Sequence, residues 1–595
     1  MSGSLFCSNL CRTCARISQT SRLKGLIPLI SRAATLLMVI ALIGVLPWLS
    51  GGDPALALLR ARSGEQEATA ETLNAIRQSL GLEQGPFALL IHWLNGLFHG
   101  DAGNSWVSGK AVLPAMLQAT GVSLTLMASA TLVAVLLCAV LCSRVFYSGL
   151  QGKRRSSAGV FAAVFTALPE FLLASFLLIA GAVFLRWFPP YGWVGWHYAV
   201  LPSLALGIPA GGYLGRIISD ALVATFSESW ITTWSAIGIS RYQIGSAVLK
   251  RTLPGVMPLV GMVLVSLTGG AIAVEKVFAI PGLGRATLGA AAAQDLPALQ
   301  AGILILLLLA MLLAGAAHLC RLIILGPALK AGSMPLPAAR SVHHRFAWFI
   351  PLLCLLLLVI LVMSGLARDP FVSTFSRLQS PSLLLPFGAD AMGRDLLARV
   401  AHGTFNTCLL ALVVSLACLA LGIIVGIFPR WLNGLIEVTN AMPPVIAGLL
   451  VAAVNGPTEA GAALAVIAVS WAPLAAHTAS LLAEIKARPY IKVLPLLGMS
   501  PLRQTLVYLL PALMGPLCRH ALLRLPGMAL ALASLGFLGL GAAPSTPEWG
   551  RILAEGMPYI ERSYWGVAAP AAALALLSIL AVSAGNLSFN KKIKY

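Results

Sequence analysis

Residues 269–285 read GGAIAVEKVFAIPGLGR, and residues 536–550 read GFLGLGAAPSTPEWG. Each glycine-rich patch follows a hydrophilic segment that closes on Leu-Pro, at Leu253-Pro254 in one case and at Leu510-Pro511 in the other. Each patch also leads into the last apolar segment of its half of the chain. A repeat of about half the chain, built from apolar segments, is typical of membrane transporters with a two-fold pathway.

The composition is that of a membrane protein. Hydrophobic residues make up 58% of the chain and charged residues 10%, whereas soluble domains carry about 25% charged residues. The mean hydropathy is +0.88. Apolar runs at residues 126–141, 303–316 and 408–428 approach or exceed the ~20 residues that a helix needs to cross a bilayer. Because barrel strands are about 10 residues long and alternate in polarity, the sequence predicts an all-α polytopic membrane protein.

We expect about twelve spans, with about six in each half, because that many apolar segments approach spanning length. The first set lies near residues 33–50, 120–146, 158–185, 199–218, 255–280 and 298–326. The second set lies near residues 346–366, 404–428, 434–454, 460–482, 513–541 and 564–586.

Lys and Arg predict the orientation, since they are enriched in the cytoplasmic loops of membrane proteins. With both termini in the cytoplasm, about 27 of the 40 basic residues lie on the cytoplasmic side and about 12 on the periplasmic side. We therefore predict cytoplasmic termini. The net charge of +20 then reflects topology, and no nucleic-acid partner is expected because no soluble basic domain accompanies the charge.

The chain divides into four parts. Residues 1–32 are an expected cytoplasmic N-terminal extension. The first membrane domain covers residues 33–326 and includes a hydrophilic periplasmic cap at about 51–119. A short polar linker with Gly and Pro, expected in the cytoplasm, occupies residues 327–345. The second membrane domain covers residues 346–595.

Neither a metal nor a cofactor is expected in this chain. Cys7, Cys11 and Cys14 have a spacing that radical enzymes use to hold an iron–sulfur cluster, but those enzymes surround the cluster with a soluble barrel. We interpret the three thiols as incidental. No Gly-x4-Gly-Lys-Ser/Thr phosphate-binding loop occurs, so any ATPase that drives this protein must be another polypeptide.

The chain resembles in sequence the permeases of dipeptide/oligopeptide/nickel ABC importers. The first half is similar to one permease subunit of that family and the second half to the other, joined head to tail. The likeness is strongest at residues 269–285 with 295–300, at 388–399, and at 536–550 with 553–556. It implies two tandem type I importer permease repeats in a bacterial inner membrane.

The resemblance also implies partners and a function. The partners would be two ABC ATPase subunits, or one fused ATPase, and a periplasmic solute-binding protein. The cargo would be small peptides or a related solute such as nickel, a metal chelate or an opine. The mechanism would be ATP-driven alternating access. The chain itself would be a transport subunit and not an enzyme.

Permeases of this family carry a cytoplasmic coupling loop of the form Glu-Ala-Ala-x3-Gly-x9-Ile-x-Leu-Pro, which docks on the ATPase. The matching residues are Ala236, Gly238, Leu253 and Pro254 in the first half, and Gly498, Leu510 and Pro511 in the second. The Glu-Ala-Ala positions depart from the pattern in both halves, and Pro495 follows them in the second. Either a helix begins at Pro495, where proline is tolerated, or the contact with the ATPase is altered. We expect the first loop to couple more strongly.

The glycine-rich patches would, by the same resemblance, face the binding protein and an outer gate. The residues concerned are Glu275, Pro281, Gly282 and Gly284 in the first half, and Gly539, Gly541, Pro547 and Trp549 in the second. Glu275 matches a family glutamate, whereas Leu532 occupies the aligned position in the second half. A simple ion pair between Glu275 and Lys276 is the alternative reading of that glutamate.

Glu170 follows a proline inside an expected span. Because a mid-bilayer carboxylate is costly, it usually faces a cavity or a partner, so Glu170 either lines the pathway or packs against polar neighbours.

Two other functions stay open for the protein as a whole. One is a secondary transporter with an internal repeat, and the other is a permease-like membrane assembly subunit that does not transport.

Overall fold

The computed structural model describes residues 33–45, 69–79, 85–152, 169–325, 348–440, 442–541 and 546–585, with short pieces at 55–56, 59, 165 and 543. Within these ranges the chain is helical and forms no β-strand, apart from three isolated β-bridges. The predicted N-terminal extension with Cys7, Cys11 and Cys14, the predicted linker and much of the predicted cap lie outside the described residues.

The first half contains a short apolar helix, two cap helices and a bundle. Their bounds are Ala33–Gly44, α4 Ala70–Ser79, α5 Pro86–Phe98, α6 Val112–Leu150, α8 Glu170–Leu177 with a π-helical extension Leu178–Phe184, α9 His197–Phe226, α10 Ser229–Ala236, α11 Arg241–Val277, α12 Leu283–Ala292 and α13 Leu296–Leu325.

The second half repeats this order with more interruptions. Its helices are α14 Phe349–Gly365, α15 Leu396–Gly426, α16 Pro429–Asn440, α17 Pro444–Asn455, α18 Glu459–Ser470, α19 Ala472–Ala487, α20 Pro489–Val493, a 3-10 turn Leu494–Leu497, α21 Pro501–Gln504, a π-turn Thr505–Leu509, α22 Leu510–Leu538, α23 Trp549–Gly556, a 3-10 turn Met557–Tyr559 and α24 Trp565–Gly585.

Six helices of the described chain are long and apolar enough to cross a bilayer, and a seventh span results if α16 and α17, which meet at 93°, count as one. Four shorter apolar helices accompany them: Ala33–Gly44, Glu170–Phe184, Phe349–Gly365 and Trp565–Leu580. With α9, these elements coincide with every predicted span position. The predicted all-α polytopic fold is confirmed.

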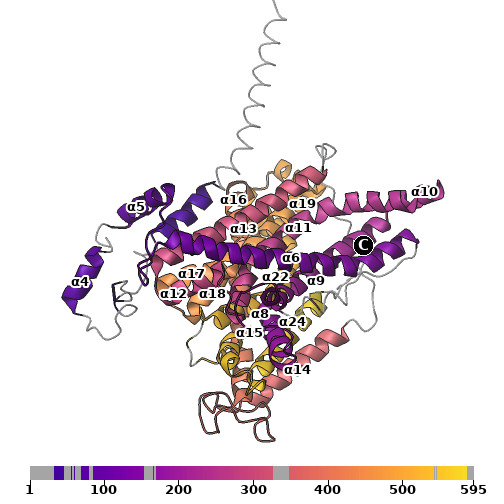
Figure 1. Cartoon of the computed structure of the whole chain (residues 1–595). Coiled ribbons are helices and arrows are strands. Elements are labelled where there is room, and N and C mark those ends of the chain that lie inside the picture. Colours follow the sequence, from indigo (N-terminus) through magenta and orange to yellow (C-terminus); the bar gives the residue numbers. More distant parts are fainter. Residues whose placement is uncertain are drawn as a thin grey trace, which may run out of the picture.

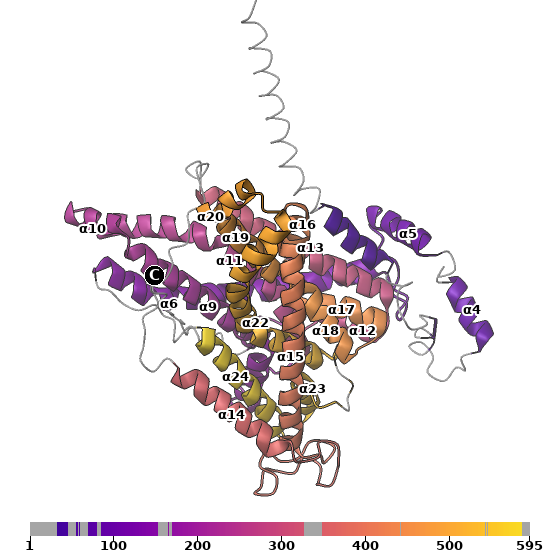
Figure 2. The same cartoon turned by 180° about the vertical axis from the view of Figure 1, so that it is seen from behind.

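The two halves also pack alike. In the first half α6 packs on α9, α9 on α11, and α11 on α12 and α13. In the second half α15 packs on α19, α19 on α22, and α22 on α23 and α24. Figure 1 shows α6 beside α9, and α14 beside α24, and Figure 2 shows the same pairs from behind. The repeat seen in the sequence is therefore a repeat of helix pairs.

Glycines bring α6 and α9 close together. Gly207, Gly211 and Gly215 recur every fourth residue along one face of α9. A Cβ atom at Gly207 would lie 2.6 Å from the carbonyl oxygen of Ala130 in α6, and one at Gly211 would lie 2.8 Å from that of Ala134. Only a residue without a side chain fits at such a seam, and seams of this kind hold helices together in membranes.

The matching seam between α15 and α19 takes its glycines from the other helix. A Cβ atom at Gly422 of α15 would lie 2.7 Å from Cβ of Leu474, and one at Gly426 would lie 2.7 Å from the carbonyl oxygen of Ala475. Both partners belong to α19. The close approach is thus kept in both halves, while the helix that supplies the glycines differs.

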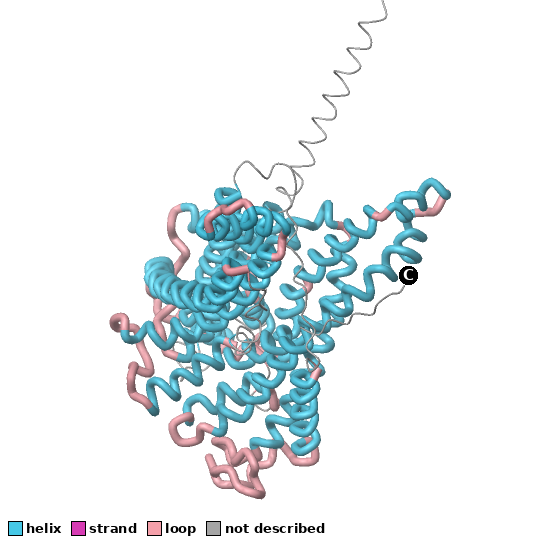
Figure 3. The backbone as a smooth tube through the Cα atoms, turned by 90° about the vertical axis from the view of Figure 1, so that its right-hand side faces the viewer, coloured by secondary structure: helices cyan, strands magenta, loops and turns pink. Residues whose placement is uncertain are grey.

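The predicted coupling segments lie apart from the cap helices and from the long loop of the second half. In Figure 2, α10 and α20 lie at the upper left, whereas α4 and α5 lie on the right and the long connection between α14 and α15 lies at the bottom. Figure 3 shows this connection as the largest described loop, away from the projecting end that carries α10. The two predicted coupling segments are therefore on one side, away from the cap helices and from this loop.

Candidate functional site

The first predicted coupling segment is a helix, a left-handed glycine and a helix cap. The helix is α10, and after it Gly238 has a φ of 81°. The backbone N–H of Ile239 then donates to the carbonyl of Trp234 at 3.0 Å, so the chain turns back at once, as it does after a glycine-terminated helix. Ser240 and Gln243 form a capping box that begins α11.

Glu228 anchors this segment to α11. The indole N–H of Trp230 donates to Glu228 at 2.7 Å, and Arg251 of α11 makes a 2.7 Å salt bridge with the same carboxylate. Trp234 lies edge-on to Trp230 with ring centroids 5.0 Å apart. A buried Ile231 completes the inner face. These contacts fix the direction in which α10 projects.

The second predicted coupling segment has the same plan in a shorter form. α20 gives way to the 3-10 turn, and Gly498 has a φ of 73°. The backbone N–H of Met499 donates to the carbonyl of Leu494 at 3.2 Å. Ser500 then caps α21 by accepting the N–H of Arg503 at 3.4 Å. The glycine, the apolar residue and the capping serine occupy matching places in both halves.

The structure contradicts the prediction that a helix begins at Pro495, and the alternative, an altered contact with the ATPase, stays a prediction. The helix does not begin there, since α20 begins at Pro489 and ends at Val493. Pro495 is instead the second residue of the 3-10 turn. A proline near the start of a helical turn has no hydrogen bond to lose there, so the segment stays compact.

The Leu-Pro pairs do not close a loop. Leu253 and Pro254 lie inside α11, and Leu510 and Pro511 begin α22 directly after the π-turn. The serine caps start the helix soon after each glycine, which is why the hydrophilic residues expected in a loop are helical. This part of the prediction was wrong.

Both segments expose apolar side chains. The side chains of Ile237 and Tyr242 are 69% and 86% exposed in the first half. Those of Leu496, Leu497 and Leu502 are 84%, 73% and 70% exposed in the second half. Ala236 is exposed beside Gly238 as well. Exposed apolar groups that lie together are typical of protein-binding surfaces.

At the other end of α11, Glu275 is buried and caps α12. Its carboxylate accepts the hydroxyl of Ser123 in α6 and the backbone N–H of Arg285 at 2.9 Å. The Ser123 hydroxyl in turn accepts the N–H of Leu283 at 2.8 Å. A side chain at Gly282 would overlap this carboxylate. Glu275 thus supplies the acceptor that the N-terminus of α12 lacks in its own sequence.

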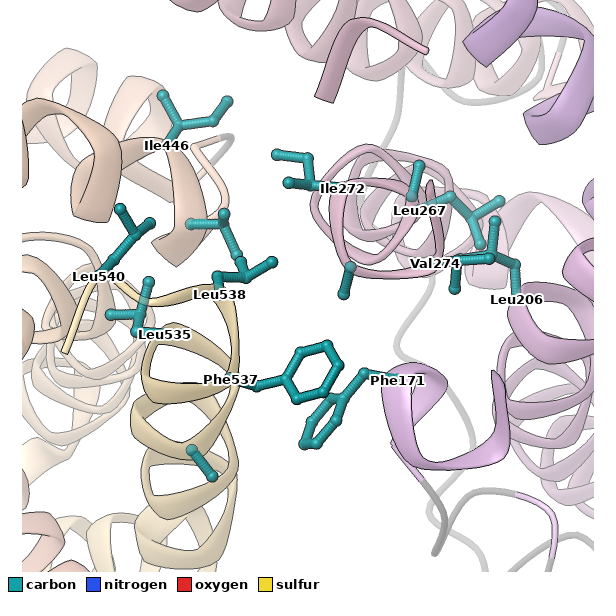
Figure 4. Close-up of a cluster of buried hydrophobic side chains, with 14 of the residues drawn as sticks. Phe171, Leu206, Leu267, Ile272, Val274, Ile446, Leu535, Phe537, Leu538 and Leu540 are labelled. Carbon is teal, nitrogen blue, oxygen red and sulfur yellow. The ribbon is translucent and has the colours of Figure 1, made fainter. Parts of the chain in front are cut away.

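Lys276 has a different partner, so the interpretation of Glu275 and Lys276 as an ion pair was wrong. Its ammonium donates to the backbone carbonyl of Phe537 at 2.8 Å and lies 5.4 Å from the centre of that ring. Phe537 stacks on Phe171 of α8 with centroids 5.2 Å apart and planes at 27°. Figure 4 shows the two rings facing each other from α8 and α22. We call Phe171, Lys276 and Phe537 the outer junction, because they join the two halves.

The patch of the second half is held by a buried indole. Trp549 is fully buried and donates its N–H to Thr404 of α15 at 3.1 Å. Asn406 donates to the carbonyl of Pro547 at 3.3 Å. Gly539 ends α22 in a left-handed conformation with a φ of 84°.

Glu548 holds a position in the second half that is comparable to that of Glu275, although its side chain makes no capping hydrogen bond to α23, and the sequence reasoning missed it. Its carboxylate lies so close to Gly536 and Gly541 that a Cβ atom at Gly536 would be 2.5 Å from it. Glu548 also precedes α23 directly, as the N-cap residue. Each half therefore places one carboxylate at the start of the short helix after its patch. The glycines at 536 and 541 are the feature of the sequence that could have indicated it, because they leave room for the side chain of Glu548.

Most of the predicted gate residues are buried. Gly282, Gly284, Gly541 and Trp549 are inaccessible, as is Pro547. Pro281 is exposed and Gly539 partly so, and these two remain able to contact another protein.

An ion network secures the loop before α15. Arg399 donates to Asp390 at 2.7 Å and to Glu555 of α23 at 2.8 Å. Arg394 donates to the same two carboxylates at 2.7 Å and 3.1 Å. Burial raises the pKa of Asp390, but the backbone N–H of Arg394 and the charges of both arginines outweigh it, so the pKa lies below its ordinary value. In the first half Asp295 secures the loop before α6, because it accepts the hydroxyl of Ser105 and the N–H of Trp106.

Glu170 is the first residue of α8 and is half-buried. Its side chain lies against Gly270 of α11, about one helical turn from Val274. It is thus close to the outer junction. Among the residues that the structure describes, no group of three or more His, Cys, Asp or Glu side chains could hold a metal ion.

Known proteins are similar to this chain in sequence. The family described as binding-protein-dependent transport system inner membrane component matches the chain twice, at residues 136–320 and 418–594. The di/tripeptide transport system permease protein of Pseudomonas aeruginosa is 35% identical over 225 residues, which are 36% of this chain and 74% of that protein. The glutathione transport system permease protein of Shigella flexneri is 31% identical over 287 residues, 48% of this chain and 89% of that protein. The chain is therefore a member of the binding-protein-dependent transport permease family and carries two copies of its membrane domain.

Proposed function

We propose that this protein supplies both permease halves of an ABC importer that brings small peptides, or a chemically related solute, into the cytoplasm. ATP hydrolysis would occur on two separate ATPase subunits or on one fused ATPase. A periplasmic binding protein would deliver the solute. The chain would lie in a bacterial inner membrane with both termini in the cytoplasm.

The observation that carries this proposal is the duplicated helix–glycine–serine element. α10 with Gly238 and α20 with Gly498 lie on one side of the molecule, and each exposes apolar side chains next to its glycine. Two such surfaces suit two docking partners related by the same two-fold symmetry as the halves. Each surface is continuous with a long helix, α11 or α22, so that a movement of the partner would move the span.

The outer junction supports alternating access. It joins α8 and α11 of the first half to α22 of the second through one ring stack and one hydrogen bond, beside the packing of α12 and α13 on α17. Both contacts are modest in strength. Rocking of the two halves would break the junction to admit the solute, and its re-formation would close the outer side while the cytoplasmic side opens.

Reconstitution tests the function. The permease is placed in liposomes with its ATPase and binding protein, and uptake of a labelled tripeptide is measured with ATP or with an ion gradient. We expect uptake that requires ATP and the binding protein. Uptake driven by an ion gradient alone would instead identify a secondary transporter. ATPase association without uptake of any tested solute would favour an assembly subunit.

Thiol labelling tests the orientation. Leu383 and Leu497 are exposed on opposite sides, in the loop before α15 and in the turn before Gly498. An impermeant reagent added to intact cells should label Leu383→Cys, and should label Leu497→Cys only after the membrane is opened. Labelling of the second thiol in intact cells would contradict the proposed topology.

A further inference from the structure

α22 carries an arginine halfway along its membrane span. Arg524 is half-buried in a helix that, with its preceding turns, is apolar enough to cross a bilayer from Pro501 to Leu538. In the described part of the chain, its guanidinium makes no hydrogen bond and no ion pair. A charged side chain at this depth is costly and rare, and it usually marks a pathway.

Two histidines lie next to it. His520 is one turn before Arg524 on α22, and its ring stacks on that of His477 in α19 with centroids 4.5 Å apart and planes at 26°. Both imidazoles are partly exposed. Imidazole, like guanidinium, offers N–H donors, so the cluster is rich in donors.

The three side chains come from two neighbouring helices of the second half, because α19 packs on α22. We call His477, His520 and Arg524 the midplane cluster. It combines the positive charge of a guanidinium with the N–H groups of two imidazoles.

We propose that the midplane cluster is a subsite for the carboxylate of a solute passing through the membrane, and hence that this permease favours anionic or C-terminally free peptides. A guanidinium binds a carboxylate through two parallel hydrogen bonds, and an imidazole can donate a third. The arginine would replace the water that the carboxylate loses. This inference rests on the transport function proposed above.

The electrostatic part can be tested without a known solute. Gly527 lies three residues beyond Arg524 on the same helix, is exposed, and has open space around a would-be Cβ atom. A single thiol is introduced by Gly527→Cys into full-length protein whose native cysteines are replaced. Its rates of reaction with an anionic and a cationic methanethiosulfonate reagent are then compared in nanodiscs.

We expect the anionic reagent to react faster, and Arg524→Gln to lower the ratio of the two rates about tenfold, because a nearby positive charge attracts the anion in a low-dielectric site. Arg524→Lys should keep most of the ratio. Arg519→Gln, which removes an exposed arginine from the same helix, is the matched control and should change the ratio less than Arg524→Gln does. A thiol that neither reagent reaches, or a ratio unchanged by Arg524→Gln, would overturn the subsite.

The transport part uses tri-alanine and its C-terminal amide in the reconstituted system. Arg524→Gln should reduce uptake of the free acid about tenfold, while ATP hydrolysis stimulated by the binding protein changes little, because a charge-assisted contact is lost without loss of coupling. Equal uptake of the free acid by wild type and variant would overturn the subsite and leave the transport function standing. Absence of ATP-dependent uptake in wild type would contradict the transport function, while the rate ratio would still report on the subsite.

Discussion

The two halves solve the same packing problems with different residues. In the first half the seam between the long span and its neighbour takes its glycines from α9, and in the second half from α15. The loop before the first long span is tied down by Asp295, whereas the loop before the second is tied down by the ion network around Arg399. The fold therefore requires close approach and a fixed loop at these places, and it does not require a particular side chain.

The two predicted coupling segments differ in another way. α10 is anchored by Glu228 to Arg251 and projects as one helix. α20 is shorter, ends in a 3-10 turn and exposes Leu496 and Leu497. The glycine and the serine cap preserve the turn in both, so the path of the chain is kept while the surface presented to a partner has diverged.

The largest loss of stability should come from a substitution in the ion network around Arg399. Asp390→Asn leaves Arg394 and Arg399 with less compensating charge in a buried site, and removing one member of a buried pair costs about 3–5 kcal/mol. Asp295→Asn in the first half removes hydrogen bonds to neutral donors and should cost about 1–3 kcal/mol. Unfolding by SDS in mixed micelles measures both. Equal losses would contradict the contrast between the two loops.

The same network predicts a pH dependence. Because the pKa of Asp390 is lowered from its ordinary 3.8, its stabilising contribution is fully present above that value and is lost as the pH falls through the lower, folded-state pKa. The unfolding midpoint of wild type should therefore not respond to this group between about pH 5 and pH 8. A loss of stability in that window that disappears in Asp390→Asn would contradict the assignment.

Substitutions in the glycine seams should give the next largest loss of stability. Gly211→Leu forces a side chain against the backbone of α6, and overpacking costs about 1–3 kcal/mol. Gly422→Leu should cost as much at the matching seam. Gly315→Leu in α13 is the control, because no atom lies within 4 Å of its would-be Cβ. Thermal unfolding in detergent measures the stability of all three variants. A Gly211→Leu variant as stable as wild type would contradict the close approach of α6 and α9.

The carboxylate cap of α12 should give a smaller effect. Glu275→Ala removes the acceptor for the N-terminus of α12 and should cost about 1–2 kcal/mol, as loss of a helix cap does. Glu275→Gln keeps an acceptor oxygen and should recover part of this. Hydrogen exchange of the α12 amides provides the readout, and protection unchanged in Glu275→Ala would show that another group caps the helix.

The coupling glycines should give the smallest change in stability. A bulky residue at Gly238 or Gly498 strains a left-handed position by about 1–2 kcal/mol without a clash, since no atom lies within 4 Å of either would-be Cβ. We expect Gly238→Leu to reduce transport-linked ATP hydrolysis more than Gly498→Leu, because α10 is one uninterrupted helix that Glu228 anchors to α11, whereas α20 gives way to a 3-10 turn. Equal losses, or a larger loss at Gly498, would refute the asymmetry. Undiminished binding of the ATPase in both variants would argue against a coupling role.

The fold was predictable because its signals are local. Apolar length predicted the spans, and the glycine-rich patches predicted the repeat. The course of the coupling segments was not predictable from Leu253-Pro254, since the caps at Ser240 and Ser500 start the helices earlier. The partner of Lys276 is a backbone carbonyl far along the chain, and His477, which stacks on His520, comes from another helix. Such long-range contacts leave no spacing in the sequence from which they could be read.

The outer junction has a consequence for how this transporter evolves. Its hydrogen bond ends on the main chain of residue 537, so a substitution of that side chain leaves the acceptor in place. Both halves also belong to one polypeptide, and tethering raises the effective concentration of one for the other to about the millimolar range. A fused pair never has to distinguish its proper partner from a second copy of itself. Fusion would therefore relax selection for a strong or discriminating interface, and the contact could be as weak as the proposed alternating access requires.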